Sequence, residues 1–84
     1  MKDDGIVAMS PKVPADDHTL SHRIVLRDLG KEYVVHMQCF EGDKHFFHDG
    51  SYFPKRHSDA LAKAWATFER RSRRILNLEE VGVL

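Results

Sequence analysis

Two apolar-rich runs that face each other across a short polar turn constrain this chain most. The runs are Tyr33–Phe40, YVVHMQCF, and His45–Phe53, HFFHDGSYF, and Glu41–Lys44 lies between them. A glycine at the first central position of a two-residue turn supplies the positive φ of a type II′ hairpin, and Gly42-Asp43 fits this rule. The opposite charges at the two ends of the turn add a cross-strand pair. The sequence therefore predicts a β-hairpin around which the rest of the chain folds.

A second hairpin is predicted just before the first. The run RIVLR from Arg23 is typical of a strand, and the DLGKE that follows it is typical of a turn. With Asp28 paired to Tyr33, the two hairpins give three antiparallel strands. Asp49-Gly50 is a further turn dipeptide, which either starts a short third hairpin or marks a bulge in one longer strand.

The segment after Pro54 has the clearest helical periodicity in the chain. Pro54 ends strand pairing because it lacks a donor N–H, and Ser58 is a suitable N-cap. We therefore predict one amphipathic helix over residues 58–76. Its predicted apolar stripe holds Leu61, Ala64, Trp65, Phe68, Ser72, Ile75 and Leu76, and its opposite side holds Lys63, Thr67, Arg70 and Arg74. The expected fold class is α+β, a three-stranded antiparallel sheet (a meander) packed on one C-terminal helix.

The chain divides into one domain with a segment at each end. Residues 18–76 form the predicted β-β-β-α domain. Residues 1–17, rich in proline and aspartate, are expected to be a flexible, disordered arm, in which Ile6–Met9 is compatible with an additional edge strand. Residues 77–84 are expected to form a loose tail or a short edge strand.

The predicted register assigns the strand side chains to two faces of the sheet. The helix-side face is expected to hold Ile24, Leu26, Val35, Met37, Cys39 and Phe46. The other face is expected to hold Arg23, Val25, Arg27, Val34, His36, Gln38, Phe40, His45 and Phe47. We call this second surface the open face. Its mixture of cationic, amide and aromatic side chains is too apolar for a plainly solvated surface, so the sequence places a binding site there.

Charge and cysteine content narrow the class of protein. The formal net charge is zero, because 11 Lys and Arg against 7 Asp and Glu in residues 18–76 are balanced by acidic residues at both ends. The single cysteine, Cys39, excludes an internal disulfide and favours a reducing compartment, so we expect a cytoplasmic protein. The start of the chain is neither a secretory signal nor a membrane span, and no membrane partner is expected.

Motifs for catalysis or cofactor binding are missing from the sequence. It contains no nucleophile elbow, P-loop, zinc-protease or dinucleotide motif, so we expect neither an enzyme nor a small-molecule substrate. Of the six histidines, only His22 and His48 could converge with Cys39 on one face, and such a set predicts no metal or cofactor. Cys39 faces Phe46 under the helix, where a thiol behaves as a small hydrophobe rather than as a nucleophile.

Two surfaces are candidates for binding. The open face is typical of a protein interface, and the first prediction is a protein partner or a second copy of the chain. Nucleic acid is the alternative, bound by the same face with cations on phosphates and Phe40 or Phe47 as a stacking platform, and with the arginines of residues 70–74 assisting. The second surface is a run of arginines, which either binds phosphate or is a solvated helix end that suits the helix dipole. The open-face candidates are Arg23, Arg27, His36, Gln38, Phe40, His45 and Phe47, and the arginine run is Arg70, Arg71, Arg73 and Arg74.

The order strand, strand, strand, helix, with GSYF at residues 50–53 and ALAKAW at residues 60–65, resembles two known module types. One is the sheet-type DNA-binding domain of phage integrases and plant ethylene-response factors, whose sheet lies in the major groove. The other is the C-terminal half of a double-stranded RNA-binding domain. The first resemblance implies that Arg23, Arg27 and Phe40 contact DNA. The outline is also similar to small phage and prophage proteins, some of which inhibit host machinery stoichiometrically, and this likeness implies an accessory or inhibitory role.

Overall fold

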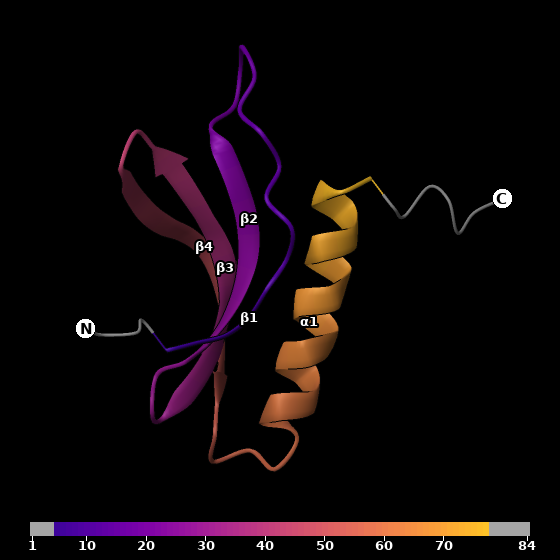
Figure 1. Ribbon diagram of the computed structural model, residues 1–84. Helices are drawn as coiled ribbons and strands as arrows, with labels where there is room; N and C mark the ends of the chain where they lie inside the picture. Colours follow the sequence, from indigo (N-terminus) through magenta and orange to yellow (C-terminus); the bar gives the residue numbers. More distant parts are fainter. Residues whose placement is uncertain (1–4, 78–84) are drawn as a thin grey trace, which may run out of the picture.

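The computed structural model describes residues 5–77 and forms an antiparallel sheet with one helix on one side of it (Figure 1). The strands lie in the sheet in chain order: β1, Ile6–Met9; β2, Ser21–Asp28; β3, Glu32–Glu41; and β4, Lys44–Pro54. The helix α1, Ala60–Ile75, comes last. The α+β class is confirmed. The prediction of three strands is wrong, because the sheet has four.

The additional strand, β1, lies in the segment predicted to be a flexible arm. β1 pairs antiparallel with β2, and its Ala8 packs against the core. The chain enters β1 through Gly5, whose φ is +76° and whose carbonyl accepts the Asp28 N–H at 2.8 Å. A Cβ at Gly5 would lie 2.5 Å from the Asp28 carbonyl oxygen, so this close approach needs glycine.

Both predicted hairpins form with the predicted register. Gly42 has a φ of +64°, and Glu41 pairs with Lys44 across the turn. In the first hairpin Asp28 pairs with Tyr33, and the Asp28 carboxylate accepts the Gly30 N–H at 2.9 Å. The pairs that define the helix-side face are therefore confirmed: Ile24 with Met37, Leu26 with Val35, and Cys39 with Phe46.

Asp49-Gly50 marks a bulge in one long strand and not a third hairpin. The register of β3 and β4 shifts between Val35 and Met37, so that His36 alone lies opposite both Asp49 and Gly50. Asp49 has a φ of +59°, a left-handed conformation that aspartate adopts more readily than most residues. The bulge bends β4 without ending it, and the strand continues to Pro54.

The helix begins two residues later than predicted. Asp59, and not Ser58, occupies the N-cap position, and its side chain makes no capping hydrogen bond. The Asp59 carboxylate instead lies 3.3 Å from Lys63 Nζ, one turn into the helix. At the other end, Arg73 and Arg74 lie in the last turn, where positive charge suits the helix dipole.

The buried side of α1 is turned relative to the predicted stripe. Leu61 is 44% exposed and Trp65 is 38% exposed, whereas Thr67, predicted to point outward, is buried. Alanines at two buried positions allow the helix backbone to approach the sheet closely. Trp65 lies on the flank, with its ring edge-on to Phe68 at a centroid distance of 5.5 Å. The buried helix residues are Ala60, Ala64, Thr67 and Phe68.

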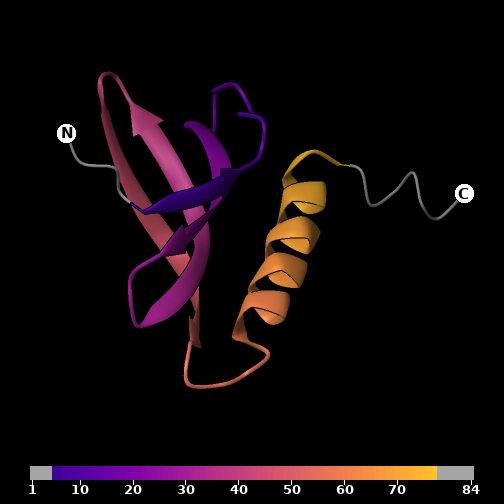
Figure 2. The same cartoon turned by 60° about the horizontal axis from the view of Figure 1, so that its bottom comes forward.

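The core lies between α1 and the helix-side face of the sheet. Its buried cluster is Ile24, Leu26, Val35, Ala64 and Phe68, and Tyr33, Met37, Phe53 and Ile75 pack around it. Phe46, predicted to join the core, is 44% exposed, so the helix does not cover it. Two views of the molecule show that α1 lies on one side of the sheet only (Figure 1 and Figure 2), and the other side is the open face.

The described chain ends shortly after α1, at Asn77, whose φ is +60°. Residues 78–84, which make up most of the predicted C-terminal tail or edge strand, lie outside the described residues, as do residues 1–4. In the described part of the chain, no helix is long and apolar enough to cross a membrane.

Candidate binding face of the sheet

The residues predicted to form the binding site lie together on the open face. Gln38 is paired with Arg23 of β2 on one side and with Phe47 of β4 on the other, and Phe40 is paired with His45. Because side chains alternate along each strand, these residues share one face with their second neighbours. The structure thus brings together Arg23, Arg27, His36, Gln38, Phe40, His45 and Phe47.

The open face has a packed layer of its own. Val25 and Val34, which belong to this face, are fully buried although the helix lies on the other side of the sheet. His36 and Gln38 are also buried. Around them lie longer side chains that are only partly exposed, including those of the two phenylalanines and two arginines. The cationic and aromatic side chains therefore shield the buried residues of the open face from solvent, and they are also its candidate contact groups.

Phe47 is the centre of one cluster on this face. The His36 ring stacks on it with a centroid distance of 4.5 Å and an interplanar angle of 9°, and the His45 ring meets it edge-on at 5.4 Å. The Arg27 guanidinium carbon lies 4.3 Å from the Phe47 ring centroid, within cation–π distance. The Arg27 side chain extends from β2 across the intervening strand β3 to Phe47, so it covers this part of the open face.

His36 is held neutral inside this cluster. Arg27 Nη1 lies 3.3 Å from His36 Nε2 and can only donate, so Nε2 accepts and the ring proton is on Nδ1. Burial, with the charge of Arg27 beside it and those of Arg71 and His48, lowers the pKa of His36 to about 4. A charged imidazolium would also lose the hydrogen bond from Arg27. The neutral ring is thus part of the packed layer at neutral pH.

Phe40 is the centre of the second cluster, which contains two cations. Lys12 Nζ lies 4.0 Å from the Phe40 ring centroid, and the Arg23 guanidinium carbon lies 5.3 Å from it. Arg23 Nε donates to Gln38 Oε1 at 2.8 Å, and its Nη1 contacts Met9 Sδ. In residues 5–77, no carboxylate pairs with Lys12 or Arg23. The contacts of both positive charges are therefore with uncharged groups.

Lys12 is a member of this site that the sequence did not predict. It follows β1, and the bridge between Val13 and His22 holds this part of the chain beside the start of β2. The sequence gives little indication that Lys12 lies near the open face, because residues 10–17 have no periodicity of their own. Met9, paired with Val25, joins the same face through β1, the segment that the sequence allowed as an additional edge strand.

The arginine run lies on the opposite side of the sheet from the open face, because α1 packs on the helix-side face (Figure 1). Arg71 points inward, and its Nη1 donates to the carbonyls of Val35 at 3.0 Å and Asp49 at 2.7 Å. Arg70, Arg73 and Arg74 are exposed. The structure therefore separates the run from the open face and divides Arg71 from the other three arginines.

The contacts of Arg71 explain how the helix is attached to the bulged strand. A bulge disrupts the hydrogen-bond ladder, and carbonyl groups near it need other donors. The Arg71 guanidinium donates to one carbonyl on each of the two strands at the irregularity, that of Val35 in β3 and that of the bulge residue Asp49 in β4. This bridge gives Arg71 a structural role.

Cys39 contacts one of its two predicted neighbours. Its Sγ lies 3.2 Å from His48 Nε2, and His48 Nδ1 lies 3.6 Å from Asp49 Oδ2. Burial, together with the negative charge of Asp49, raises the pKa of the Cys39 thiol. A neutral, buried thiol is a poor nucleophile and a poor metal ligand. Over residues 5–77, no group of three or more His, Cys, Asp and Glu side chains is arranged to hold a metal ion.

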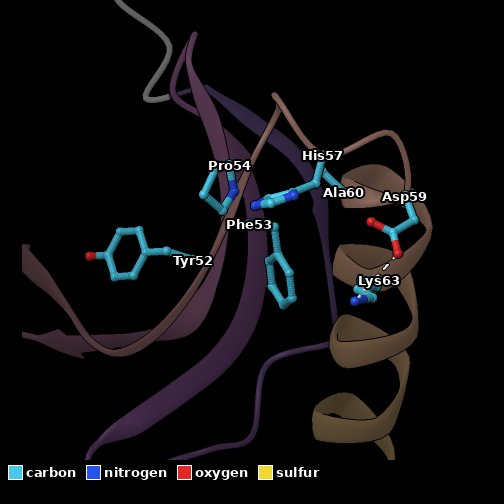
Figure 3. Close-up of a pocket in the computed structure, with 7 residues that line it drawn as sticks. All are labelled: Tyr52, Phe53, Pro54, His57, Asp59, Ala60 and Lys63. Carbon is cyan, nitrogen blue, oxygen red and sulfur yellow. Dashed lines mark ion pairs between the residues drawn. The ribbon is translucent and has the colours of Figure 1, made fainter.

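A hollow lies where β4 passes into α1, away from the two clusters. It has a volume of about 240 Å³ and is open to solvent on one side. Figure 3 shows the Phe53 ring in the space between the strands and the helix, with the Asp59–Lys63 ion pair on the helix side and Tyr52 turned away. We call it the β4–α1 hollow, and its lining residues are Tyr52, Phe53, Pro54, His57, Asp59, Ala60 and Lys63.

Comparison with known proteins assigns the chain to no family. No family model matches it, and neither the curated proteins nor the solved structures contain a match.

Proposed function

We propose that this protein is a small, non-enzymatic binding module whose open face contacts a protein partner. The observation that carries the proposal is the Phe40 cluster, in which Lys12 and Arg23 lie on an aromatic ring with neutral partners. Arginine and aromatic side chains contribute most of the binding free energy in protein interfaces. Here they occur together, next to a buried layer of Val25 and Val34.

The arrangement is prepared for binding before a partner arrives. Hydrogen bonding to Gln38 and packing on Phe40 restrict the rotamers of Arg23, so less side-chain entropy is lost on association. Because the charges of Lys12 and Arg23 are not compensated by carboxylates in the described residues, a partner that presents Asp or Glu gains charge-assisted hydrogen bonds. The proposed partner is therefore a protein with an acidic contact surface.

Self-association through the open face is less favoured than binding to a different protein. A two-fold contact places the same patch of both copies together, and two copies of Lys12 and Arg23 repel each other. The proposal includes a cytoplasmic location, which the single thiol of Cys39 supports. An accessory or inhibitory role of the phage type is compatible with a module that binds and does not catalyse.

Nucleic acid is the second candidate partner, favoured by the gathering of Lys12, Arg23 and Arg27 on one side of the sheet. These cations can contact phosphates. Base stacking is less favoured, because the rings of Phe40 and Phe47 already have cations over them and a base would have to displace one. The arginine run cannot assist, since it lies on the other side of the sheet.

Paired baits of equal charge distinguish these possibilities. The protein, a Lys12→Gln/Arg23→Gln variant and an Arg56→Gln/Arg73→Gln control, whose two arginines are exposed and lie outside the open face, are immobilised, and proteins captured from a nuclease-treated lysate are quantified. Both variants lose two positive charges, but only the first changes the open face. We expect a protein that the wild type and the control retain equally and that the open-face variant retains at least tenfold less.

Two outcomes contradict the proposal of a protein partner. If every captured protein is lost equally from both variants, binding depends on net charge and not on the open face. If capture disappears on nuclease treatment, and the protein binds duplex DNA or RNA with an affinity that falls steeply with salt, nucleic acid is the partner.

A further inference from the structure

The end of β4 beside the start of α1 combines two features that fit an extended peptide. β4 is the last strand of the sheet, so one of its sides has no strand neighbour in residues 5–77. The β4–α1 hollow lies next to this edge, between Phe53 and the helix (Figure 3). Proteins that add a peptide strand to a sheet use this pair of features: the edge binds the peptide backbone and the pocket selects one side chain.

The two edges of the sheet differ in how well they are protected. At one edge, β1 has four residues with an irregularity near Val7, and Pro11 follows it closely. At the other edge, β4 has eleven residues. Lys44 and the bulge at Asp49 protect the first half of β4, since charges and bulges disfavour pairing of an edge strand with another strand. The stretch after the bulge, which includes the 56% exposed Tyr52, has no such protection before Pro54.

The hydrogen-bond ladder determines which backbone groups point outward from this stretch. The Lys55 N–H donates to the Lys31 carbonyl at 2.9 Å, so these two residues form a hydrogen-bonded pair. Because such pairs alternate along an antiparallel ladder, the pair of Val34 and Tyr52, three positions away, is a non-hydrogen-bonded one. The N–H and C=O of Tyr52 therefore point away from β3, where a new antiparallel strand would meet them.

The same geometry directs a side chain of the added strand into the hollow. A residue placed opposite Phe53 on the new strand shares the face of Phe53, with the Cβ atoms about 5 Å apart. That face is the helix side, so its side chain enters the space lined by His57, Ala60 and Lys63. A volume of about 240 Å³ is below the range of about 300–1,000 Å³ that is usual for small-molecule sites and suits one large apolar side chain.

The charges on the adjacent flank of α1 indicate which residues of the bound segment should lie beside that apolar residue. Arg70 and Arg74 follow Lys63 by seven and eleven positions, so they lie on the same side of the helix as the hollow. A strand added to β4 would run beside this basic flank. We propose that the β4 edge binds an extended segment of a partner protein that has one large apolar residue opposite Phe53 and acidic residues beside it.

Titration of the isotope-labelled protein with short peptides tests this site. The probes are blocked ten-residue peptides of alternating threonine and glutamate with phenylalanine, alanine or lysine at one central position. We expect the phenylalanine peptide to bind at least tenfold more tightly than the alanine peptide. At saturation, hydrogen exchange of the Tyr52 N–H should slow at least tenfold.

Two matched pairs of variants locate the peptide. Tyr52→Pro removes an N–H that β3 does not use and should weaken binding at least tenfold, whereas Tyr52→Thr also loses the ring but should change it less than threefold. Arg70→Glu should weaken binding at least threefold, whereas Arg73→Glu, on the outer side of the helix, should not. Circular dichroism confirms that each variant is folded, and if Tyr52→Pro does not fold, the Arg70 pair and the Tyr52 exchange rate decide.

Three results would overturn the proposal. The phenylalanine and alanine peptides could bind equally, which removes the role of the hollow. The peptide-induced shifts could fall on Lys12, Arg23 and Phe40, which would assign the peptide to the open face. Exchange of the Tyr52 N–H could slow with protein concentration alone, which would mean that a second copy covers the edge. The site is independent of the proposed function, so Lys12→Gln/Arg23→Gln should leave peptide binding unchanged.

Discussion

Val34 and Val35 are neighbours in β3 and point to opposite faces of the sheet, yet both are fully buried. Val35 lies under α1, in the cluster that contains Ala64 and Phe68. Val34 lies on the open face, where the surrounding layer is built from cationic and aromatic side chains such as Arg27. A sheet face can thus be closed either by a helix or by its own long side chains.

The difference between the two covers has consequences for stability and for function. A helix cover is a rigid backbone whose apolar contacts cannot easily collapse around a smaller side chain. A cover of arginine and phenylalanine side chains can rearrange, and its charged groups remain available to a partner. We therefore expect the helix-side face to dominate stability and the open face to dominate binding, with His36 as the part of the open face that matters most for stability.

The largest expected effect comes from His36, through pH. Its pKa is lowered from the ordinary value of 6.5 to about 4 in the folded protein, so the folded state keeps it neutral while the unfolded state takes up a proton. The stabilisation is complete above pH 6.5 and is lost as the pH falls toward 4, by about 3 kcal/mol in total. Urea unfolding at pH 7.0, 6.0, 5.0 and 4.5 measures this loss. In His36→Gln, the decline between pH 6.5 and 5 should disappear, and an unchanged decline would assign it to other groups.

The two valines provide the most direct comparison of the covers. Val35→Ala should lower the free energy of unfolding by about 2–3 kcal/mol, because α1 leaves a cavity over the missing methyl groups. Val34→Ala should lower the free energy of unfolding by about 1 kcal/mol, because the flexible side chains of the open face can move to fill the space left by the methyl groups. Chemical denaturation of both variants gives the two values. Equal losses would show that the open face is packed as rigidly as the core.

Arg71 tests whether the helix is attached through the bulge. Arg71→Met keeps much of the apolar stem but leaves the carbonyls of Val35 and Asp49 without their donor, and should cost about 2 kcal/mol. The control is Arg70→Met on the same helix, which should change stability by less than about 0.5 kcal/mol. Thermal unfolding of both variants under the same conditions checks this. Similar effects of the two substitutions would mean that the bridge contributes nothing specific.

The smallest effect is expected at the Phe40 cluster. Arg23→Gln removes a cation–π contact at a partly exposed site and should lower the free energy of unfolding by about 0.5–1 kcal/mol. The same variant should bind the partner of the open face at least several times more weakly. A stability loss above about 2 kcal/mol would contradict the view that this cluster serves binding more than folding.

Much of the sheet could be predicted from the sequence, because its register depends on local turn chemistry. Gly42 fixes one hairpin and the pairing of Asp28 with Tyr33 fixes the other, and the period of two then assigns each side chain to a face. The nine residues predicted for the open face, seven of them binding candidates, follow from that register alone. Asp49-Gly50 could not be assigned, because a turn and a bulge both accept an aspartate with positive φ.

Features that depend on distant contacts could not be predicted. The inward position of Arg71 depends on carbonyl groups near a bulge that lies 22 residues earlier in the chain. The rotation of the α1 stripe depends on how closely a helix can approach a sheet, which favours Ala60 and Ala64 over the bulkier Trp65. Lys12 joins the open face only because β1 pairs with β2, and a four-residue strand leaves little periodicity to detect.

The central claim, that the open face is a layer packed by its own side chains with a neutral His36 inside it, is tested most directly by nuclear magnetic resonance. The ring signals of His36 are followed from pH 7.5 downward in the folded protein. The structure predicts a midpoint near 4, with the proton on Nδ1 at neutral pH, and a change in the midpoint when Arg27 is replaced by Gln. A midpoint near 6.5 that does not respond to Arg27→Gln would show that His36 is solvated and that the open face has no packed layer.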